Sequence, residues 1–259
     1  SSGSGSLSPF FYWGGSKDEE GRGVALHGGM IYITGYTNST EADFPLKNPF
    51  QPALLGGTDA FVIQMDRSGE LYYSSYLGGD KDDKGAAIAV DDVGNIYLTG
   101  SAASANFPVT GSTGAFDATL GGSLDAFVAK INPNLDGRYS LVYSTYLGGS
   151  STDSGAGIAV DRNANAYVVG STTSSNFPIK SSVAQGKYGG NSDAFIAKFD
   201  PAQTGANSLV YSTYLGGNGA DSGTGIAVVH NPSGIVRTYV TGATTSTNFP
   251  FTADAYDKS

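Results

Sequence analysis

Acidic side chains recur at one position of a repeated loop, and carboxylates are the groups in this sequence that could do chemistry. The acid stands four residues after a Gly-Gly pair in each of four loops, as Glu19, Asp83, Asp153 and Asp221. Clustered oxygens of this kind bind calcium. A single carboxylate can instead accept backbone N–H groups and brace a turn. Because one acid per loop supplies too few ligands without help from backbone carbonyls, we favour the bracing role and treat the four as structural turn acids.

Two of these loops are richer in acids and are the better candidates for metal binding. Asp80 and Asp82 stand beside Asp83, and further acids flank Glu19. We name Asp80, Asp82 and Asp83 as candidate calcium ligands. We expect no cofactor, with calcium as the one candidate that the sequence offers.

A second set of acids precedes strand-like segments, at Asp59, Asp125 and Asp193. Two carboxylates brought together could act as the acid and base of a glycosidase. A catalytic pair is usually singular, however, whereas these acids are copied from repeat to repeat. We therefore interpret them as turn caps and predict no catalytic residues.

Histidine occurs twice, at His27 and His230, and both positions fall near a predicted hairpin. They could form a joint site only if the chain closes into a ring that makes its first and last repeats neighbours. No recognisable nucleophile motif accompanies them.

The strand-like segments that position these residues recur along the sequence as a repeat. The segment Ser140–Gly149 returns letter for letter as Ser208–Gly217, with a degraded copy at Glu70–Gly79 and a fainter one at Ser6–Gly15. The copies are separated by about 64 to 70 residues. Such a period is typical of propellers and other repeat architectures.

Each period contains four strand-like segments, exemplified by Gly155–Asp161, Asn165–Gly170, Asp125–Ile131 and Leu141–Leu147. Apolar residues alternate with others in the third type, which is the pattern of a strand. A link with the word Asn-Phe-Pro or Asp-Phe-Pro joins the second type to the third. No stretch has the apolar periodicity of a helix.

These features predict an all-β fold of β-propeller-type repeats, with about four blades of four antiparallel strands and the last blade incomplete. A β-sandwich is the rival architecture. We expect one domain over residues 1–259, with repeats at about 10–79, 80–149, 150–217 and, in part, 218–259. Phe10–Trp13 is predicted to be a spare strand of the fourth type, and the last repeat ends after its second strand.

The repeated words resemble the bacterial SBBP family of beta-propeller repeats. They are Tyr-Ser-Thr-Tyr-Leu-Gly-Gly, Gly-Ile-Ala-Val-Asp, Tyr-Val-x-Gly-Ser-Thr, Asn-Phe-Pro and Asp-Ala-Phe-x-Ala-Lys, spread over residues 10–250. The resemblance implies blades and an extracellular or cell-surface setting, since the family occurs in large secreted and surface proteins. It supplies no catalytic residues. The family's name suggests seven blades, whereas this chain has about half that number.

Composition narrows the function classes. The net charge is -9, and the 14 lysines and arginines are scattered, so the chain lacks the basic face of a nucleic-acid binder. No apolar run is long enough for membrane insertion. Cysteine is absent, which is compatible with export and rules out thiol chemistry. No signal peptide is visible in the sequence.

We therefore expect a non-enzymatic extracellular or cell-surface scaffold that mediates protein interaction or self-assembly, with filament or surface-layer formation by strand exchange as one form. Its expected partners are copies of itself or other surface proteins. The first alternative is a carbohydrate-binding, lectin-like propeller with a polysaccharide partner, for which the 16 tyrosines and 13 phenylalanines would supply stacking rings. The second is a propeller hydrolase or lyase. Free sheet edges at both ends of the chain favour the scaffold.

Overall fold

The computed structural model describes residues 12–181, 183–230, 236–252 and 255. The fold is all-β, with 49% strand and 3% helix. The first sheet contains β1 (Glu19–His27), β2 (Met30–Thr37), β3 (Asp59–Met65) and β4 (Leu71–Leu77). The second contains β5 (Asp83–Val90), β6 (Ile96–Ala102), β7 (Asp125–Ile131) and β8 (Leu141–Leu147). The third contains β9 (Asp153–Val160), β10 (Ala166–Thr172), β11 (Asp193–Phe199) and β12 (Leu209–Leu215), and the last pairs β13 (Asp221–His230) with β14 (Val236–Thr244).

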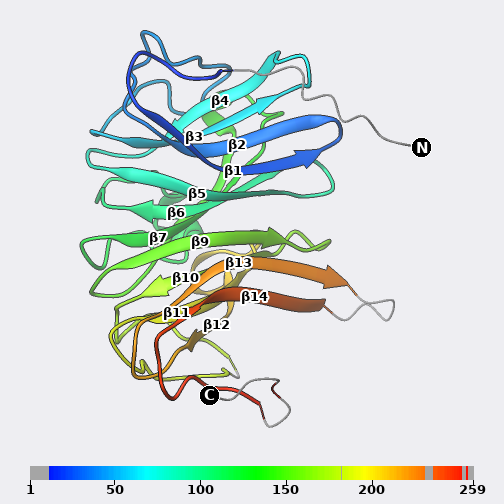
Figure 1. The fold of residues 1–259 in the computed structure, drawn as a ribbon. Coiled ribbons are helices and arrows are strands. Elements are labelled where there is room, and N and C mark those ends of the chain that lie inside the picture. The colour runs from blue at the N-terminus through cyan, green and yellow to red at the C-terminus, as the bar shows by residue number, and fades with distance from the viewer. Residues whose placement is uncertain (1–11, 182, 231–235, 253–254, 256–259) are drawn as a thin grey trace, which may run out of the picture.

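Each sheet is an antiparallel meander in which consecutive strands are neighbours. We call the three four-stranded sheets blades 1, 2 and 3, and the pair β13–β14 the half-blade. The blades follow one another in a row, with blade 1 at one end and the half-blade at the other (Figure 1). The first strands line up along this row, since β5 lies beside β1 and β9, and β9 lies beside β13.

The strand predictions are confirmed for all four types, and the third-type strands have the predicted bounds. The prediction of a spare strand at Phe10–Trp13 is not confirmed. Residues 10 and 11 lie outside the described residues, and Tyr12 and Trp13 are not in a strand. Short helical turns occur between strands. The turn α1 (Gly111–Gly114) lies between the second and third strands of blade 2, whereas η1 (Gly137–Tyr139) and η2 (Gly205–Asn207) lie between the third and fourth strands of blades 2 and 3.

Small residues in the first strands let neighbouring blades approach each other through their backbones. A Cβ atom added to Gly157 would lie 3.3 Å from the Cα of Gly225 in the next blade, and one on Gly23 would lie 3.1 Å from the Cα of Ala87. All four first strands carry a register shift near these glycines, where a β-bulge increases the local twist.

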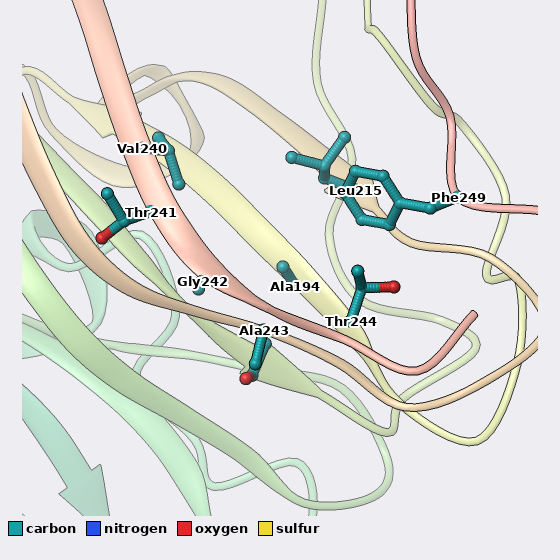
Figure 2. A pocket seen from close by; sticks show the side chains of 10 residues that line it. Ala194, Leu215, Val240, Thr241, Gly242, Ala243, Thr244 and Phe249 are labelled. Carbon is teal, nitrogen blue, oxygen red and sulfur yellow. The ribbon is translucent and has the colours of Figure 1, made fainter. Parts of the chain in front are cut away.

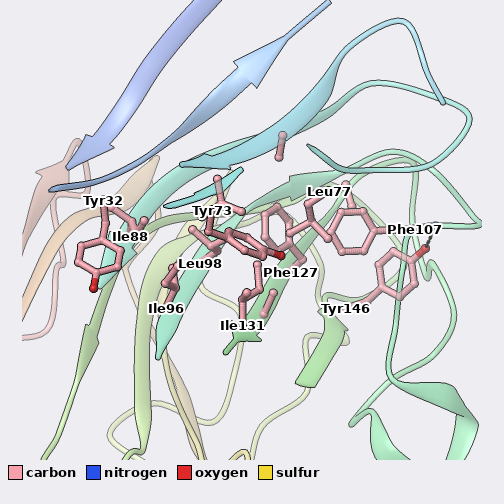
Figure 3. Packing of buried hydrophobic residues seen from close by; sticks show 14 residues of the cluster. Tyr32, Tyr73, Leu77, Ile88, Ile96, Leu98, Phe107, Phe127, Ile131 and Tyr146 are labelled. Atoms are coloured by element: carbon pink, nitrogen blue, oxygen red, sulfur yellow. Dashed lines mark hydrogen bonds between the residues drawn. The ribbon is translucent and has the colours of Figure 1, made fainter. Parts of the chain in front are cut away.

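The core lies between blades rather than within one. Tyr73 and Leu77 of blade 1 pack against Phe127, Ile131 and Tyr146 of blade 2, and all five side chains are buried (Figure 3). The equivalent cluster between blades 2 and 3 contains Tyr143, Leu147, Phe195, Phe199 and Tyr214. The two tyrosines of one fourth strand thus enter clusters on opposite sides of their sheet, as period-2 alternation requires. Burying each such side chain contributes roughly 1.5–3 kcal/mol.

Among the described residues, no helix is long and apolar enough to cross a membrane.

Candidate functional site

The turn acids at the start of blades 2 and 3 and of the half-blade bind the backbone of the loops around them. Asp83 Oδ2 accepts hydrogen bonds from the Gly79 N–H at 2.7 Å and from the Ser104 hydroxyl at 2.6 Å. Its Oδ1 accepts from the N–H groups of Ala103 and Ser104. The Oδ2 bonds recur at Asp153, with Gly149 and Ser174, and at Asp221, with Gly217 and Ser246. These buried carboxylates therefore connect the Gly-Gly loop to the Asn-Phe-Pro link.

Glu19 occupies the same register in blade 1 but makes a different contact. Its Oε1 accepts a hydrogen bond from the Thr37 hydroxyl at 2.8 Å. The neighbouring loop is held by Asp43, whose Oδ2 accepts from the Ser16 N–H at 2.7 Å. Asn106 accepts the equivalent bond from the Asp80 N–H in blade 2, so the link of blade 1 holds its loop as the other links do.

The second set of acids caps the turn before each third strand. Asp125 accepts from the N–H groups of Gly121 at 2.8 Å and Gly122 at 3.2 Å. Asp59 and Asp193 bind equivalent backbone groups of Leu55, Gly56 and Gly189. All three carboxylates are fully buried. Burial raises the pKa of Asp59 and of Asp125 to about 6, and the nearby carboxylates of Asp83 and Asp153 add to the shift.

Each of these caps lies close to the turn acid of the following blade. A Cβ atom on Gly148 would lie 2.6 Å from Asp125 Oδ1 and 2.7 Å from Asp153 Oδ2. Gly216 separates Asp193 from Asp221 in the same way. The structure therefore brings the two predicted sets of acids together in pairs, and only glycine fits between the members of these pairs. Such pairs are copied along the row, which distinguishes them from a single catalytic dyad.

The candidate calcium ligands do not converge in the structure. Asp80 and Asp82 are exposed, whereas Asp83 is buried and uses both oxygens in the hydrogen bonds described above. The Asp80 N–H donates to Asn106 Oδ1. In the part of the chain that the structure describes, no group of three or more His, Asp or Glu residues has the arrangement of a metal site. Calcium binding at this loop stays a prediction.

The two histidines lie on different blades at opposite ends of the row. His27 ends β1, and His230 ends β13, with β5 and β9 between these strands (Figure 1). His230 Nε2 accepts a hydrogen bond from the Arg162 N–H at 3.1 Å. The ring closure that a joint histidine site would need does not occur among the described residues.

At the outer end of blade 1, an apolar cluster is covered by residues that precede β1. Phe44, Phe61, Ile63 and Met65 are buried there, and Trp13 packs against them. The strand positions of Phe61, Ile63 and Met65 are those that contact the preceding blade in blades 2 and 3. Ile31 and Ile33 line an adjoining pocket of about 380 Å³ together with Trp13. This end thus presents a blade face that has no blade before it among the described residues.

At the other end, the half-blade leaves a pocket of about 270 Å³. Its lining includes Ala194 and Leu215 of blade 3, Val240 of β14 and Phe249 of the following link (Figure 2). Its lining is mostly apolar, and β14 pairs only with β13 among the described residues. The molecule thus offers an apolar pocket beside an unpaired sheet edge.

Sequence reasoning did not name these pocket residues or the serines that bind the turn acids. A signal for both was present. The serine stands two residues before the Asn of each Asn-Phe-Pro word, and the pocket residues occupy positions that are buried in the complete repeats.

A family model for the SBBP beta-propeller repeat matches residues 73–108 and 142–178. Each matched segment runs from the fourth strand of one blade, through the first two strands of the next, to its Asn-Phe-Pro link. No curated protein matches the chain. With its three antiparallel blades and one half-blade, the chain is a repeat protein of propeller-type blades, two segments of which match the SBBP beta-propeller repeat.

Proposed function

We propose that this chain is a non-enzymatic scaffold of the extracellular space or cell surface, which mediates protein interaction and assembles with copies of itself or with other surface proteins. The observation that carries the proposal is the pair of unfinished ends. One end has the outward face of blade 1, and the other has the free edge of β14 beside an apolar pocket.

Unfinished blade surfaces favour association because they combine two driving forces. Unpaired N–H and C=O groups at a sheet edge can pair with an added strand. The apolar side chains beside that edge gain free energy when water is removed from them. The two ends differ in shape, so contact between them is head-to-tail and generates a ring or a filament.

The acids support a structural role over a catalytic one. Asp83, Asp153 and Asp221 use their carboxylates to hold backbone and serine groups, and Asp59, Asp125 and Asp193 cap turns. Their placement follows the repeat, as bracing requires. The extracellular setting rests on the SBBP repeats, and a composition without cysteine is compatible with it.

Light scattering during size-exclusion chromatography tests the proposal directly. We expect the full-length chain to form species larger than a monomer, in proportions that rise with protein concentration. Deleting residues 1–13 removes the segment whose sequence resembles a fourth strand and which would pair with the edge of β14 in another copy. It should abolish this assembly while blades 1 to 3 stay folded. Deleting residues 1–6 is the matched control and should leave assembly intact. A full-length chain that is strictly monomeric at high concentration contradicts the proposal.

A further inference from the structure

The junction between blades 2 and 3 shows what covers the face of a blade that is turned towards the next blade. Leu147 and Ala126 of blade 2 are fully buried there by the cluster that contains Phe177, Phe195 and Tyr214 of blade 3. Phe195 comes from the third strand of blade 3, and Tyr214 from its fourth. The third and fourth strands therefore contribute large rings to each complete junction.

The same positions at the next junction lack these rings. Leu215 of blade 3, the counterpart of Leu147, is only half-buried and lines the pocket beside the half-blade. Figure 2 shows Leu215 and Phe249 on one side of this pocket and Val240 of β14 on the other. We call the pocket and the free edge of β14 the acceptor groove. The acceptor groove lies where, in blade 3, the strands β11 and β12 complete the sheet.

The link that bears Phe249 is already held in the conformation of the complete blades. Asn248 Oδ1 accepts from the Asn218 N–H at 2.7 Å, and the Ser246 hydroxyl accepts from the Gly219 N–H at 2.8 Å. Asn176 and Ser174 bind the loop before blade 3 in the same way. The acceptor groove is thus preorganised, which lowers the cost of ordering it when a partner binds.

Two groups in this link lack the partners that their counterparts have. Phe177 stacks on Phe195 of the third strand, with ring centroids 4.6 Å apart, and Phe107 lies 4.8 Å from Phe127. The carbonyl of Ser174 accepts a hydrogen bond from the hydroxyl of Tyr214 in the fourth strand. Phe249 and the Ser246 carbonyl have no such ring or hydroxyl beside them among the described residues.

We propose that the acceptor groove binds a β-hairpin, contributed by a partner polypeptide, that has the sequence pattern of the third and fourth strands. Its first strand pairs with β14 and places a phenylalanine against Phe249. Its second strand supplies a tyrosine hydroxyl to the Ser246 carbonyl and apolar side chains to Leu215. This inference rests on the proposed scaffold function and names the chemical class of its partner.

A peptide of residues 191–217, the chain's own third and fourth strands, serves as the probe. We expect the labelled peptide to bind the full chain saturably in a fluorescence-anisotropy titration. Replacing Phe195 by Ser in the peptide should weaken binding about tenfold or more, which corresponds to 1.4 kcal/mol or more. In the protein, Val240→Asp should weaken binding to a similar extent. Thr224→Ala, at an exposed position of β13, which does not pair with the added hairpin, should leave it unchanged.

Hydrogen exchange shows whether the half-blade stays folded in each variant, because β13–β14 pairing protects its amides. Binding of the peptide should slow exchange at β14 further, in the wild type and in Thr224→Ala. Absence of saturable binding, or equal binding by the Phe195→Ser peptide, overturns the inference. Protection of β14 in Val240→Asp with unchanged affinity overturns it as well.

The same peptide separates this inference from the proposed function. If the chain assembles and the peptide neither binds nor disrupts the assembly, the scaffold function stands and the hairpin partner is wrong. If the peptide binds but the chain neither assembles nor associates with another protein, the hairpin acceptor stands and the scaffold function fails.

Discussion

Two junctions have nearly the same residues but differ in how deeply these residues are buried. One lies between blades 2 and 3, and the other between blade 3 and the half-blade. Leu147 and Phe177 are buried at the first junction, whereas their counterparts Leu215 and Phe249 are only partly covered at the second. Loop bracing is the same at both, since Asp153 and Asp221 make equivalent bonds. Local conformation is thus independent of the third and fourth strands, while the apolar core depends on them.

The largest expected difference concerns the phenylalanine of the link. Phe177→Ala should lower the free energy of unfolding by about 3–5 kcal/mol, because it empties a packed site between two blades. Phe249→Ala should cost less, about 1–2 kcal/mol, since its ring is only partly buried and no ring of a third strand packs on it. Urea unfolding of both variants checks this. Equal losses would mean that Phe249 is covered as well as Phe177.

The buried caps predict a decrease in stability as the pH rises. The pKa of Asp59 and of Asp125 is about 6 in the folded state, above the ordinary value, so the folded chain retains protons that the unfolded chain releases. The free energy of unfolding should therefore fall between about pH 4 and pH 7, by about 1–3 kcal/mol for each group. Asp125→Asn cannot ionise and should flatten this dependence.

Asp193 lies at the junction with the half-blade, so its pH dependence can be compared with that of Asp125 at the complete junction. Burial raises its pKa too, with a further contribution from Asp221. Asp193→Asn should flatten the pH dependence less than Asp125→Asn does, because the half-blade covers its side of the junction less completely. Denaturation curves at several pH values measure the slopes. A stability that rises over this interval in the wild type would contradict the shifts.

A smaller difference in the free energy of unfolding is expected from tyrosine hydroxyls that form hydrogen bonds between blades. The Tyr143 hydroxyl is within 2.9 Å of the Ser208 hydroxyl, and both are buried. Tyr143→Phe should cost about 1 kcal/mol, because it leaves Ser208 without this partner. Tyr211 has the same place in blade 3 and has no hydroxyl partner from a following blade among the described residues. Tyr211→Phe should be neutral, and thermal melting of the two variants measures the difference.

The smallest effect is expected from calcium at the loop of Asp80, Asp82 and Asp83. If an ion binds there, removing it with a chelator should lower the melting temperature through linkage. The corresponding loop before Asp153 has Ser150 and Thr152 in place of the first two acids. A double replacement, Asp80→Ser with Asp82→Thr, should therefore abolish any response to calcium. A wild-type melting curve that chelation leaves unmoved excludes the site.

The strand positions could be predicted from the sequence because their signals are local. Alternating side chains mark Asp125–Ile131, and turn residues mark its ends, so no knowledge of neighbours was needed. The segment at Phe10–Trp13 shows the limit of this reasoning. It resembles a fourth strand in its letters, but Tyr12 and Trp13 are not in a strand, since a strand also needs a neighbour to pair with.

The sequence by itself determined the repeat, the strands within it and the positions of the acids. Only the tertiary structure decided that Asp125 lies beside Asp153, that the described blades form an open row, and that Leu215 borders a pocket while Leu147 is buried. The physical reason is that backbone conformation depends on neighbours in the chain. Burial and the pKa of a carboxylate depend instead on which strands, distant in sequence, pack on the other side of the sheet.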